Sequence, residues 1–596
     1  MRIRRGRSIG ALAVAAGLLA TAACGNGGGK AGTSGAGTDT RAAGKGGTLK
    51  IVASSDLTNL DTSQEYEVVG QYLFRAITRQ LTAYPGDAAQ LKDDVEAKDD
   101  LAASHTVSPD GLTYTFPLRD GITFSGPSTR AIVSTDFEYA LKRLCDPNGP
   151  SGAIGYYTAT IKGMKGFCDG FAKVKTGDVA AVKTYIDGHK VAGIDATDPK
   201  KVVFTLTQKA GDFLNIVALS FATPLPEEVV SKYLTDSPEF KQNFVSSGPY
   251  YIANYTPDKS YDFKRSPNYN AASDPLRKSF VDEITVDLAV GSDESQFQQI
   301  NADQADLSLD ITTPPAPVTR AAQQANDGRL HISPEGRVDY LVFNSRPQNA
   351  TSPCGKAVQD PKVRQAFNYA IDKTAIVQIR GGAVQSVPTG QILTSTITGY
   401  KKNDPYATTD SKGDPAKAKA MLAAAGFPKG LTCRLIHRTK NKNADIATEL
   451  QQNLAAAGIT VQLNKVPDKD YYSKHLQKPT VNDWDISVPG WSPDWQGKSA
   501  RSFFLPLLSK KYSPCQDGTT NYGCYGNDEV DAQVDAALAA DDPATLWAGV
   551  DARVMQDAPW VPLVEQNAVV ITSKRLKGFH WYNLSDGADI TNVGVS

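Results

Sequence analysis

The sequence of 596 residues has few of the residues that usually mark catalytic or metal sites. It contains six His, seven Cys, four Met and six Trp, and no two histidines stand three or four positions apart. No H-E-x-x-H motif, no P-loop and, in the mature chain, no G-x-S-x-G motif occurs. These absences argue against zinc, nucleotide and serine hydrolases. A secreted enzyme with paired carboxylates, such as a glycosidase, stays an alternative because 64 acidic residues leave room for such a pair.

The sequence also lacks a strong net charge and, beyond its N-terminal segment, a long apolar run. The formal net charge at pH 7 is -1, which provides no electrostatic basis for binding nucleic acid. No later apolar run is long enough to cross a bilayer. The composition is otherwise that of a globular protein, 41% hydrophobic and 21% charged, and the length corresponds to roughly three or four domain-sized units.

The N-terminal segment is typical of an export signal, with basic residues, an apolar run and then small residues that end at Cys24. The Cys after small residues resembles the bacterial lipobox, in which Cys24 becomes the lipidated first residue. Ordinary cleavage is the alternative, because Thr21 stands where a lipobox usually has Leu. We predict a signal peptide over 1–23, followed by a lipidated Cys24 and a flexible tether over 24–46. These features place the protein at the outer face of the cell membrane, anchored by lipid.

Without Cys24, six cysteines remain, an even number in an oxidising compartment. Proximity along the chain favours two disulfides and leaves the other two cysteines as a third pair. The expected pairs are Cys145–Cys168, Cys515–Cys524 and Cys354–Cys433. None of these spacings is typical of a metal site, so we expect no bound metal and no cofactor.

Local patterns predict a mixed α/β fold. The alternating residues 112–119 predict a half-buried strand, and Asp120-Gly121 predicts a hairpin into residues 122–124. Residues 146–200 look irregular and Gly-rich, which we interpret as an insertion. From about residue 340 strands and helices alternate, and two of the helices begin at Asp-Pro, with Pro361 and Pro415. The β-rich texture returns near the C-terminus, which predicts two lobes joined by more than one crossing.

One stretch, WDISVPGWSPDW at 484–495, holds three of the six Trp. Its first half predicts a short strand, and its Pro-Gly dipeptide is expected to end the strand's hydrogen-bond ladder. The loop that follows would present Trp491 and Trp495 as stacking faces, with Asp494 as a charged acceptor for a ligand. Alternatively, the tryptophans fill a core and Asp494 caps a helix or turn.

Several blocks, in order along the chain, resemble the family-5 extracellular solute-binding proteins, which are the oligopeptide, dipeptide and nickel receptors of ABC importers. The similarity runs from about Gly47 to the C-terminus. The blocks are SPDGLTYTF at 108–116, LRDGITF at 118–124, SGPY at 247–250, DPKVRQA at 360–366, NYAID at 368–372, and Asp414-Pro415 with Ala418 and Gly426.

The resemblance implies a two-lobed α/β fold of the periplasmic-binding-protein type, cluster C, with a hinge between the lobes. Lobe I then has an extra subdomain, and the chain returns to lobe I at its end. The expected segments are lobe I at 47–80 and 246–339, the extra subdomain at 81–245, lobe II at 340–560 and the return at 561–596.

In peptide-binding members of this family, an Asp three residues after a Gly-Trp receives the α-ammonium of the ligand, and Gly490, Trp491 and Asp494 match that pattern. The resemblance implies a monomeric receptor that closes on short peptides and delivers them to an ABC permease, without enzymatic chemistry. A receptor for an oligosaccharide, a nickel chelate or an opine-like compound is the alternative. We therefore expect Gly490, Trp491, Asp494 and Trp495 to contact ligand, and Trp484 to lie in the core.

Overall fold

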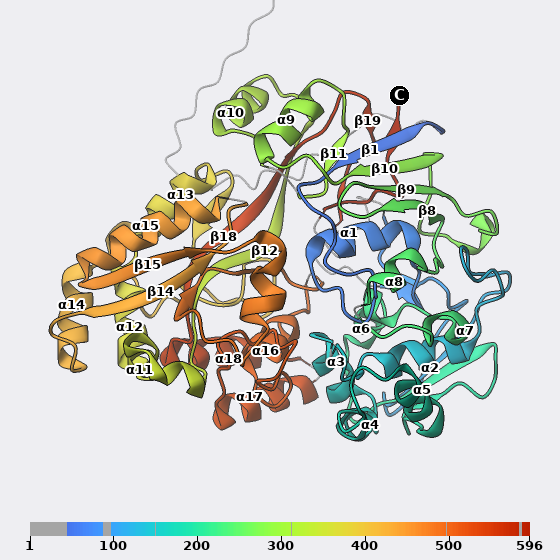
Figure 1. Ribbon diagram of the computed structural model, residues 1–596, viewed down its shortest axis with the longest axis horizontal. Coiled ribbons are helices and arrows are strands. Elements are labelled where there is room, and N and C mark those ends of the chain that lie inside the picture. Colours follow the sequence, from blue (N-terminus) through green and yellow to red (C-terminus); the bar gives the residue numbers. More distant parts are fainter. Residues whose placement is uncertain are drawn as a thin grey trace, which may run out of the picture. The chain divides into compact units, whose positions relative to one another are not determined.

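The computed structural model describes residues 45–86, 97–149, 151–235, 237–310, 313–440, 442–495, 497–540, 542–582 and 587–596. The predicted signal peptide, Cys24 and nearly all of the predicted tether lie outside the described residues. Three main sheets with covering helices form two lobes (Figure 1). Across the described ranges, every helix is too short or too polar to span a membrane.

The first lobe is built on a five-stranded sheet with the order β11–β1–β10–β9–β8. β1 pairs in parallel with β10 and β11, whereas β10, β9 and β8 are antiparallel. Alternation decides the buried face, since Ile284 and Val286 are buried and Thr285 between them is partly exposed. The strands are β1 Thr48–Val52, β8 Tyr250–Thr256, β9 Ser260–Arg265, β10 Glu283–Asp287 and β11 Leu307–Ser308, and the helices of this part are α1 Val68–Ile77, α9 Asp293–Asn301 and α10 Ala316–Gln324.

A four-stranded sheet, β4–β5–β7–β6, and a group of helices form the remaining part of the first lobe. The strands are β4 Thr106–Val107, β5 Thr113–Pro117, β6 Ile194–Asp195 and β7 Lys201–Thr205. The helices are α2 Ser134–Arg143, α3 Ile154–Thr160, α4 Met164–Phe171, α5 Val179–Gly188, α6 Phe213–Ile216, α7 Glu227–Val230 and α8 Pro238–Gln242. Residues 146–200 therefore contain three helices within the described ranges, so the prediction that this segment is irregular is wrong, while its interpretation as an insertion stays a prediction.

The predicted hairpin at Asp120-Gly121 is also wrong. β5 pairs with β4 and with the distant β7, while Thr123 makes only an isolated bridge with Ala131. Val202 and Phe204 of β7 are fully buried in the same core as β5. A distant strand with a matching apolar face thus replaces the local partner that the turn residues predicted.

The second lobe contains a seven-stranded sheet in the order β13–β18–β12–β16–β14–β15, with β17 paired to β12. Its strands are β12 Leu330–Phe343, β13 Ser386–Pro388, β14 Leu431–His437, β15 Ile459–Lys465, β16 Ile486–Ser487, β17 Gly490–Trp491 and β18 Trp560–Ile571. Its helices are α11 Pro353–Ala357, α12 Pro361–Ala370, α13 Lys373–Arg380, α14 Pro415–Ala424, α15 Asn443–Ala456, α16 Arg501–Leu508, α17 Asp528–Ala539 and α18 Ala544–Asp557. Both predicted Asp-Pro helix starts are confirmed: Asp360 and Asp414 accept hydrogen bonds from backbone N–H groups of α12 and α14 at 2.8 and 2.9 Å.

Two long antiparallel strands, β12 and β18, run from one lobe to the other. Just after β18, Ser573 Oγ donates to Asp306 Oδ1 in the first lobe at 2.6 Å, whereas the opposite end of β12 pairs with β16 in the second lobe. The ladder shifts register between Pro334 and Arg337, where Gly336 has φ +72°. This bulge bends the crossing strand where it passes between the two lobes. The domain boundaries predicted after residues 339 and 560 fall within or beside these strands and stay predictions.

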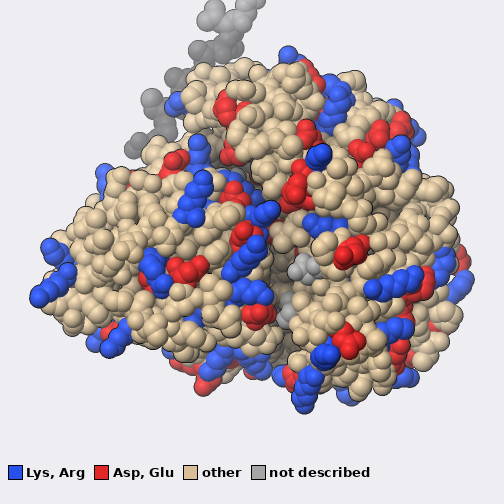
Figure 2. Space-filling view, viewed as in Figure 1, with Lys and Arg blue, Asp and Glu red and all other residues tan. Residues whose placement is uncertain are grey.

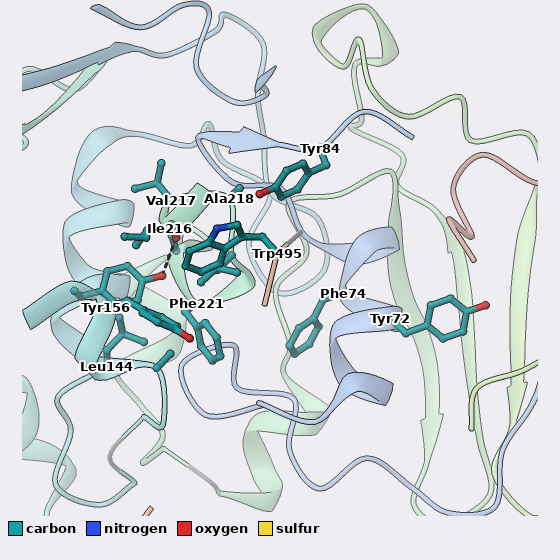
Figure 3. Close-up of a cluster of buried hydrophobic side chains, with 14 of the residues drawn as sticks. Tyr72, Phe74, Tyr84, Leu144, Tyr156, Ile216, Val217, Ala218, Phe221 and Trp495 are labelled. Atoms are coloured by element: carbon teal, nitrogen blue, oxygen red, sulfur yellow. Dashed lines mark hydrogen bonds between the residues drawn. The ribbon is translucent and has the colours of Figure 1, made fainter. Parts of the chain in front are cut away.

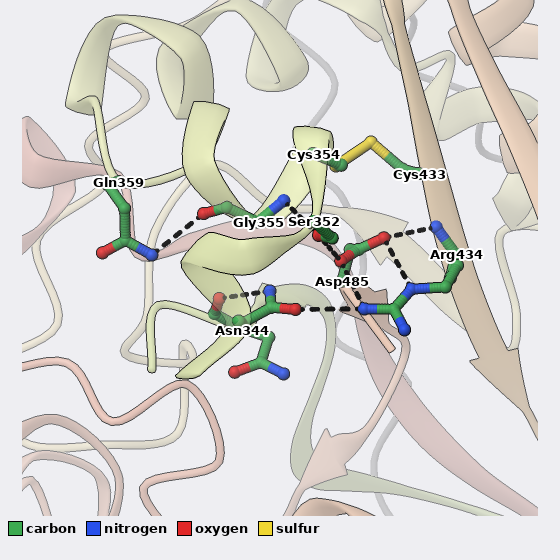
Figure 4. The surroundings of a disulfide bond; sticks show 9 residues. Asn344, Ser352, Cys354, Gly355, Gln359, Cys433, Arg434 and Asp485 are labelled. Carbon is green, nitrogen blue, oxygen red and sulfur yellow. Dashed lines mark hydrogen bonds and ion pairs between the residues drawn. A yellow bond between two sulfur atoms is a disulfide. The ribbon is translucent and has the colours of Figure 1, made fainter. Parts of the chain in front are cut away.

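The structure forms the three disulfides that proximity favoured, with Cα–Cα distances of 5.0 Å for Cys145–Cys168, 5.1 Å for Cys354–Cys433 and 5.2 Å for Cys515–Cys524. Cys354–Cys433 ties α11 to β14 (Figure 4). Beside it, the Asp485 carboxylate accepts from Ser352 Oγ at 2.6 Å and pairs with the Arg434 guanidinium at 2.9 Å. These contacts fix the beginning of the Trp-rich stretch to the second lobe.

Candidate ligand-binding cleft

A cavity of about 780 Å³ is lined by residues of both lobes. Its volume lies in the range of about 300–1,000 Å³ that is usual for sites that enclose organic ligands. The first lobe contributes residues 64–69 and 147–149, the crossing strands contribute 566–569, and the second lobe contributes 490–494. Figure 2 shows the hollow between the two halves of the surface. All five residues that follow Pro489, residues 490–494, line the cavity and form one wall.

The Pro-Gly dipeptide of the Trp-rich stretch does not end its ladder, contrary to the prediction. The Pro489 carbonyl accepts from Tyr340 N at 3.2 Å. Gly490 of β17 then pairs with Asp339 of β12. Proline lacks only the donor, so its carbonyl still contributes to the sheet. A Cβ at position 490 would collide with the Arg337 guanidinium and the Asp339 carboxylate. Glycine here lets this charged pair lie directly against the strand.

The Asp494 carboxylate contacts two tyrosines of the first lobe. Tyr66 Oη donates to Asp494 Oδ2 at 2.9 Å, and Tyr156 Oη donates to the same oxygen. Burial raises the pKa of Asp494 to about 7, although the two hydroxyl donors lower it. Both hydroxyls use Oδ2, and among the described residues no donor bonds to Oδ1, which can therefore accept from a group in the cavity.

Trp491, which we predict to contact ligand, also lines the cavity. Its side chain is largely buried, and its Nε1 donates to Ser502 O at 3.0 Å. Its ring centroid lies 5.5 Å from that of Tyr66. An aromatic pair contributed by both lobes therefore borders the carboxylate site.

Trp495 does not line the cavity, which corrects the prediction that it contacts ligand. Its side chain is 0% exposed and lies among apolar residues of the first lobe (Figure 3). Trp484 is also 0% exposed, as predicted for a core residue. Its carbonyl accepts from Asn344 Nδ2 at 2.9 Å within the second lobe.

The second-lobe side of the cavity is rich in basic residues, and Figure 2 shows Lys and Arg along this edge of the hollow. The basic lining residues are Arg337, Arg380, Arg438, Lys440, Lys442 and Lys478. Arg438 is 6% exposed, and its guanidinium lies 5.2 and 5.0 Å from the ring centroids of Tyr471 and Tyr472. Among the described residues no carboxylate pairs with Arg438, and its buried Nε has no hydrogen-bond partner. An anionic group of a ligand would compensate this buried charge.

The first-lobe side of the cavity is acidic around Tyr66, where Glu65 and Glu67 also line the wall. The Glu65 carboxylate accepts from the backbone N–H groups of Asn59 and Glu67 at 3.0 and 2.7 Å. Burial raises the pKa of Glu65 to about 8, and the neighbouring Glu67 raises it further. The cavity therefore offers acidic and basic surfaces on opposite lobes.

Sequence reasoning found Gly490, Trp491 and Asp494 but missed Tyr66, Tyr156 and Arg438. Tyr66 stands between two acids, Glu65 and Glu67, and this cluster is the only local signal that could have indicated a site. Tyr156 and Arg438 stand in ordinary helical and strand-end contexts. Only the tertiary structure brings Arg438 to the cavity and the Tyr156 hydroxyl to Asp494.

The cavity between two lobes joined by crossing strands is the arrangement of a binding protein that encloses its ligand. The family model of the bacterial extracellular solute-binding proteins, family 5 Middle, matches residues 96–513. The chain belongs to this family. It is the solute-binding component of an ABC importer and not an enzyme, which confirms both predictions.

The relatives extend over nearly the whole chain. The glutathione-binding protein GsiB of Salmonella paratyphi A is 24% identical over 542 residues, which cover 89% of this chain and 91% of that protein. Among solved structures, clavulanic acid biosynthesis oligopeptide binding protein 2 has a TM-score of 0.75 at 24% identity and covers 94% of this chain and 98% of its own. The murein tripeptide binding protein MppA of Escherichia coli has a TM-score of 0.76 at 17% identity, with coverage of 93% and 99%. These structures confirm the predicted two-lobed α/β fold.

Proposed function

We propose that the protein captures short peptides outside the cell membrane and presents them to the permease of its importer. The observation that carries this proposal is Asp494, a carboxylate on the cavity wall with one oxygen bonded to two tyrosines and the other without a hydrogen bond from the described residues. A peptide α-ammonium removed from water needs such a charged acceptor. A hydrogen bond to a charged group contributes about 1.5–3 kcal/mol.

Arg438 is the proposed partner for the peptide carboxylate. Its guanidinium lines the cavity, is buried, and stacks near Tyr471 and Tyr472. A planar guanidinium can bind a carboxylate through two parallel N–H groups. One acidic and one basic anchor together match a zwitterion, and this favours a peptide over a neutral oligosaccharide.

The names of the relatives support the same ligand class. One is a glutathione-binding protein, one an oligopeptide binding protein and one a murein tripeptide binding protein. Each binds a peptide or a peptide derivative according to its name. The side chains that this protein prefers depend on the rest of the cavity wall.

Binding is proposed to shift the equilibrium between an open and a closed form. A ligand held by Asp494 and bordered by Tyr66 contacts both lobes at once, so it stabilises the closed form more than the open one. One chain supplies all of these contacts, which is consistent with a monomer.

We further propose that Cys24 is lipidated and that residues 24–46 tether the folded part to the membrane. Such a tether keeps the binding protein close to its permease and raises its effective concentration there. Mass spectrometry of the membrane-associated protein would test the lipid on Cys24.

The proposed function is tested with the purified protein and a tripeptide pool. Equilibrium dialysis followed by mass spectrometry should show retained tripeptides, and acetylation of their N-termini should abolish most retention. Asp494→Asn should weaken the binding of free-amine tripeptides by about 10- to 150-fold, since it removes one charge-assisted hydrogen bond. Arg438→Gln should weaken tripeptides with a free C-terminus more than the amidated pool.

The control is Asp528→Asn, an exposed acid at the start of α17 whose partner is Lys510. It removes one carboxylate away from the cavity and should leave retention unchanged. Retention of sugars rather than peptides, or equal binding of acetylated and free tripeptides, would contradict the proposed function.

A further inference from the structure

Trp495 occupies an apolar pocket of the first lobe although it belongs to the stretch anchored in the second. Its ring centroid lies 5.5 Å from that of Tyr156, and the rings meet edge to face at 65°. Figure 3 shows the indole beside Ile216, Val217, Ala218 and Phe221, which are all buried. The pocket thus consists of α3, α6 and the short segment after α6.

Trp495 is anchored to the second lobe through the strands that precede it. The stretch before it pairs with β12 through β16 and β17, and the indole Nε1 donates to Lys498 O at 3.2 Å. The polar atom of the ring is therefore satisfied within its own segment. The ring itself meets Tyr156 of the first lobe, and its one polar atom bonds to Lys498 O, so the ring can enter and leave the pocket without losing that hydrogen bond.

Two polar contacts accompany the indole at the same junction. The preceding residue, Asp494, accepts from Tyr66 and Tyr156. A few residues later, Arg501 of α16 pairs with Asp212 of the first lobe at 2.9 Å. The indole therefore lies between two polar contacts of the lobes: the hydrogen bonds of Asp494 and the ion pair of Arg501.

We propose that Trp495 is a positioning residue for ligand binding, which docks into the first lobe on closure and carries Asp494 to the hydroxyls of Tyr66 and Tyr156. It sets the population of the closed form and so the affinity, without touching the ligand. For peptide ligands this inference rests on the proposed function.

The physical basis is the apolar surface of the indole. A buried Trp removes roughly 150–250 Å² from water, and an opening of the lobes would expose both the ring and its pocket. The closed form is therefore favoured even in the empty protein. Because the apparent affinity of a ligand scales with the fraction of protein in the binding-competent form, loss of the docked ring weakens binding.

The test compares three variants: Trp495→Leu removes the ring, Ala218→Leu fills its pocket from the first lobe, and Trp484→Leu is the matched control. Trp484 has the same residue type and the same 0% exposure as Trp495, but it is buried within the second lobe. Thermal unfolding first establishes that each variant is folded. Small-angle X-ray scattering then measures the radius of gyration without ligand, and dialysis measures binding of the tripeptide pool.

We expect Trp495→Leu and Ala218→Leu to enlarge the ligand-free protein and to weaken tripeptide binding by about tenfold or more. Trp484→Leu should lower the unfolding temperature but leave both quantities unchanged. The proposal is overturned if folded Trp495→Leu keeps the wild-type radius and affinity, or if Trp484→Leu changes both as strongly. If the wild-type protein retains no tripeptide, the proposed function fails, while the ligand-free radii still decide the role of Trp495.

Discussion

At the residue scale, the pKa of Asp494 connects ligand binding to pH. In a solvent-exposed open form this carboxyl would keep its ordinary pKa of 3.8, whereas burial in the closed form raises it to about 7. The empty closed form therefore binds a proton more tightly than the open form. The proton stabilises empty closure below about pH 7, and this stabilisation is lost as the pH rises through 7. In the proposed peptide complex, the ligand ammonium takes the place of that proton.

We accordingly predict that affinity for free-amine tripeptides falls as the pH is lowered from 7.5 to 5.5. Where the empty protein is closed, the loss approaches about tenfold per pH unit, because one proton competes with one ammonium. The amine itself stays protonated over this range, and dialysis at each pH measures the slope.

Asp494→Asn is the control for this pH dependence, since its amide does not titrate. Its weak residual binding should be independent of pH. An unchanged slope in Asp494→Asn would assign the titration to another group of the cavity wall, such as Glu65, whose pKa burial raises to about 8.

At the element scale, the disulfides differ in what they hold. Cys354–Cys433 spans 79 residues and joins a helix to a central strand of the second lobe. Cys515–Cys524 spans 9 residues, and Asp517, Thr520 and Tyr522 of its loop line the cavity. The long crosslink restricts the unfolded chain more than the short one.

Removing Cys354–Cys433 with paired Cys→Ala substitutions should therefore destabilise the second lobe by about 4.5 kcal/mol, against about 2.7 kcal/mol for Cys515–Cys524. Urea unfolding followed by tryptophan fluorescence measures the difference. Only the short crosslink should alter tripeptide affinity in the folded protein. A larger loss of stability for Cys515–Cys524 would show that native packing, rather than loop length, decides.

At the scale of the whole molecule, the two lobes approach closely at Gly155 of α3. A Cβ at this position would lie 2.8 Å from the Tyr512 carbonyl oxygen. Gly155 belongs to the first lobe and Tyr512 to the second, so the contact exists only while the lobes are closed. A side chain here would penalise the closed form and leave the open form unstrained.

Gly155→Ala is thus predicted to weaken tripeptide binding by about 5- to 150-fold, the equivalent of an overpacking cost of about 1–3 kcal/mol. Gly166→Ala is the matched control, because Gly166 lies in the neighbouring helix α4 with no atom within 4 Å of an added Cβ. Equal affinities for the two variants would show that the lobes close without this contact.

Prediction from the sequence succeeded where an element depends on interactions between neighbours in the chain. The helix starts at Asp360 and Asp414 could be predicted because an N-cap is a local interaction between residues close together in the chain. The strand at 112–119 was predicted, but its partner β7 was not, because β7 lies about 90 residues away in the sequence. The turn residues at 120–121 instead predicted pairing with the neighbouring residues 122–124. Pairing between distant strands depends on matching faces that a single stretch does not reveal.

The sequence by itself determined the family, the positions of the main helices and the disulfide partners, and it predicted the acceptor at Asp494, because each depends on a motif, a local pattern or proximity. Only the tertiary structure decided that Tyr66 and Tyr156 meet this carboxylate, that Arg438 faces the cavity and that Trp495 lies outside it. The chemistry of an indole determines that it will leave water. Which apolar surface receives it depends on the contact between two lobes, and for Trp495 that surface is the first lobe.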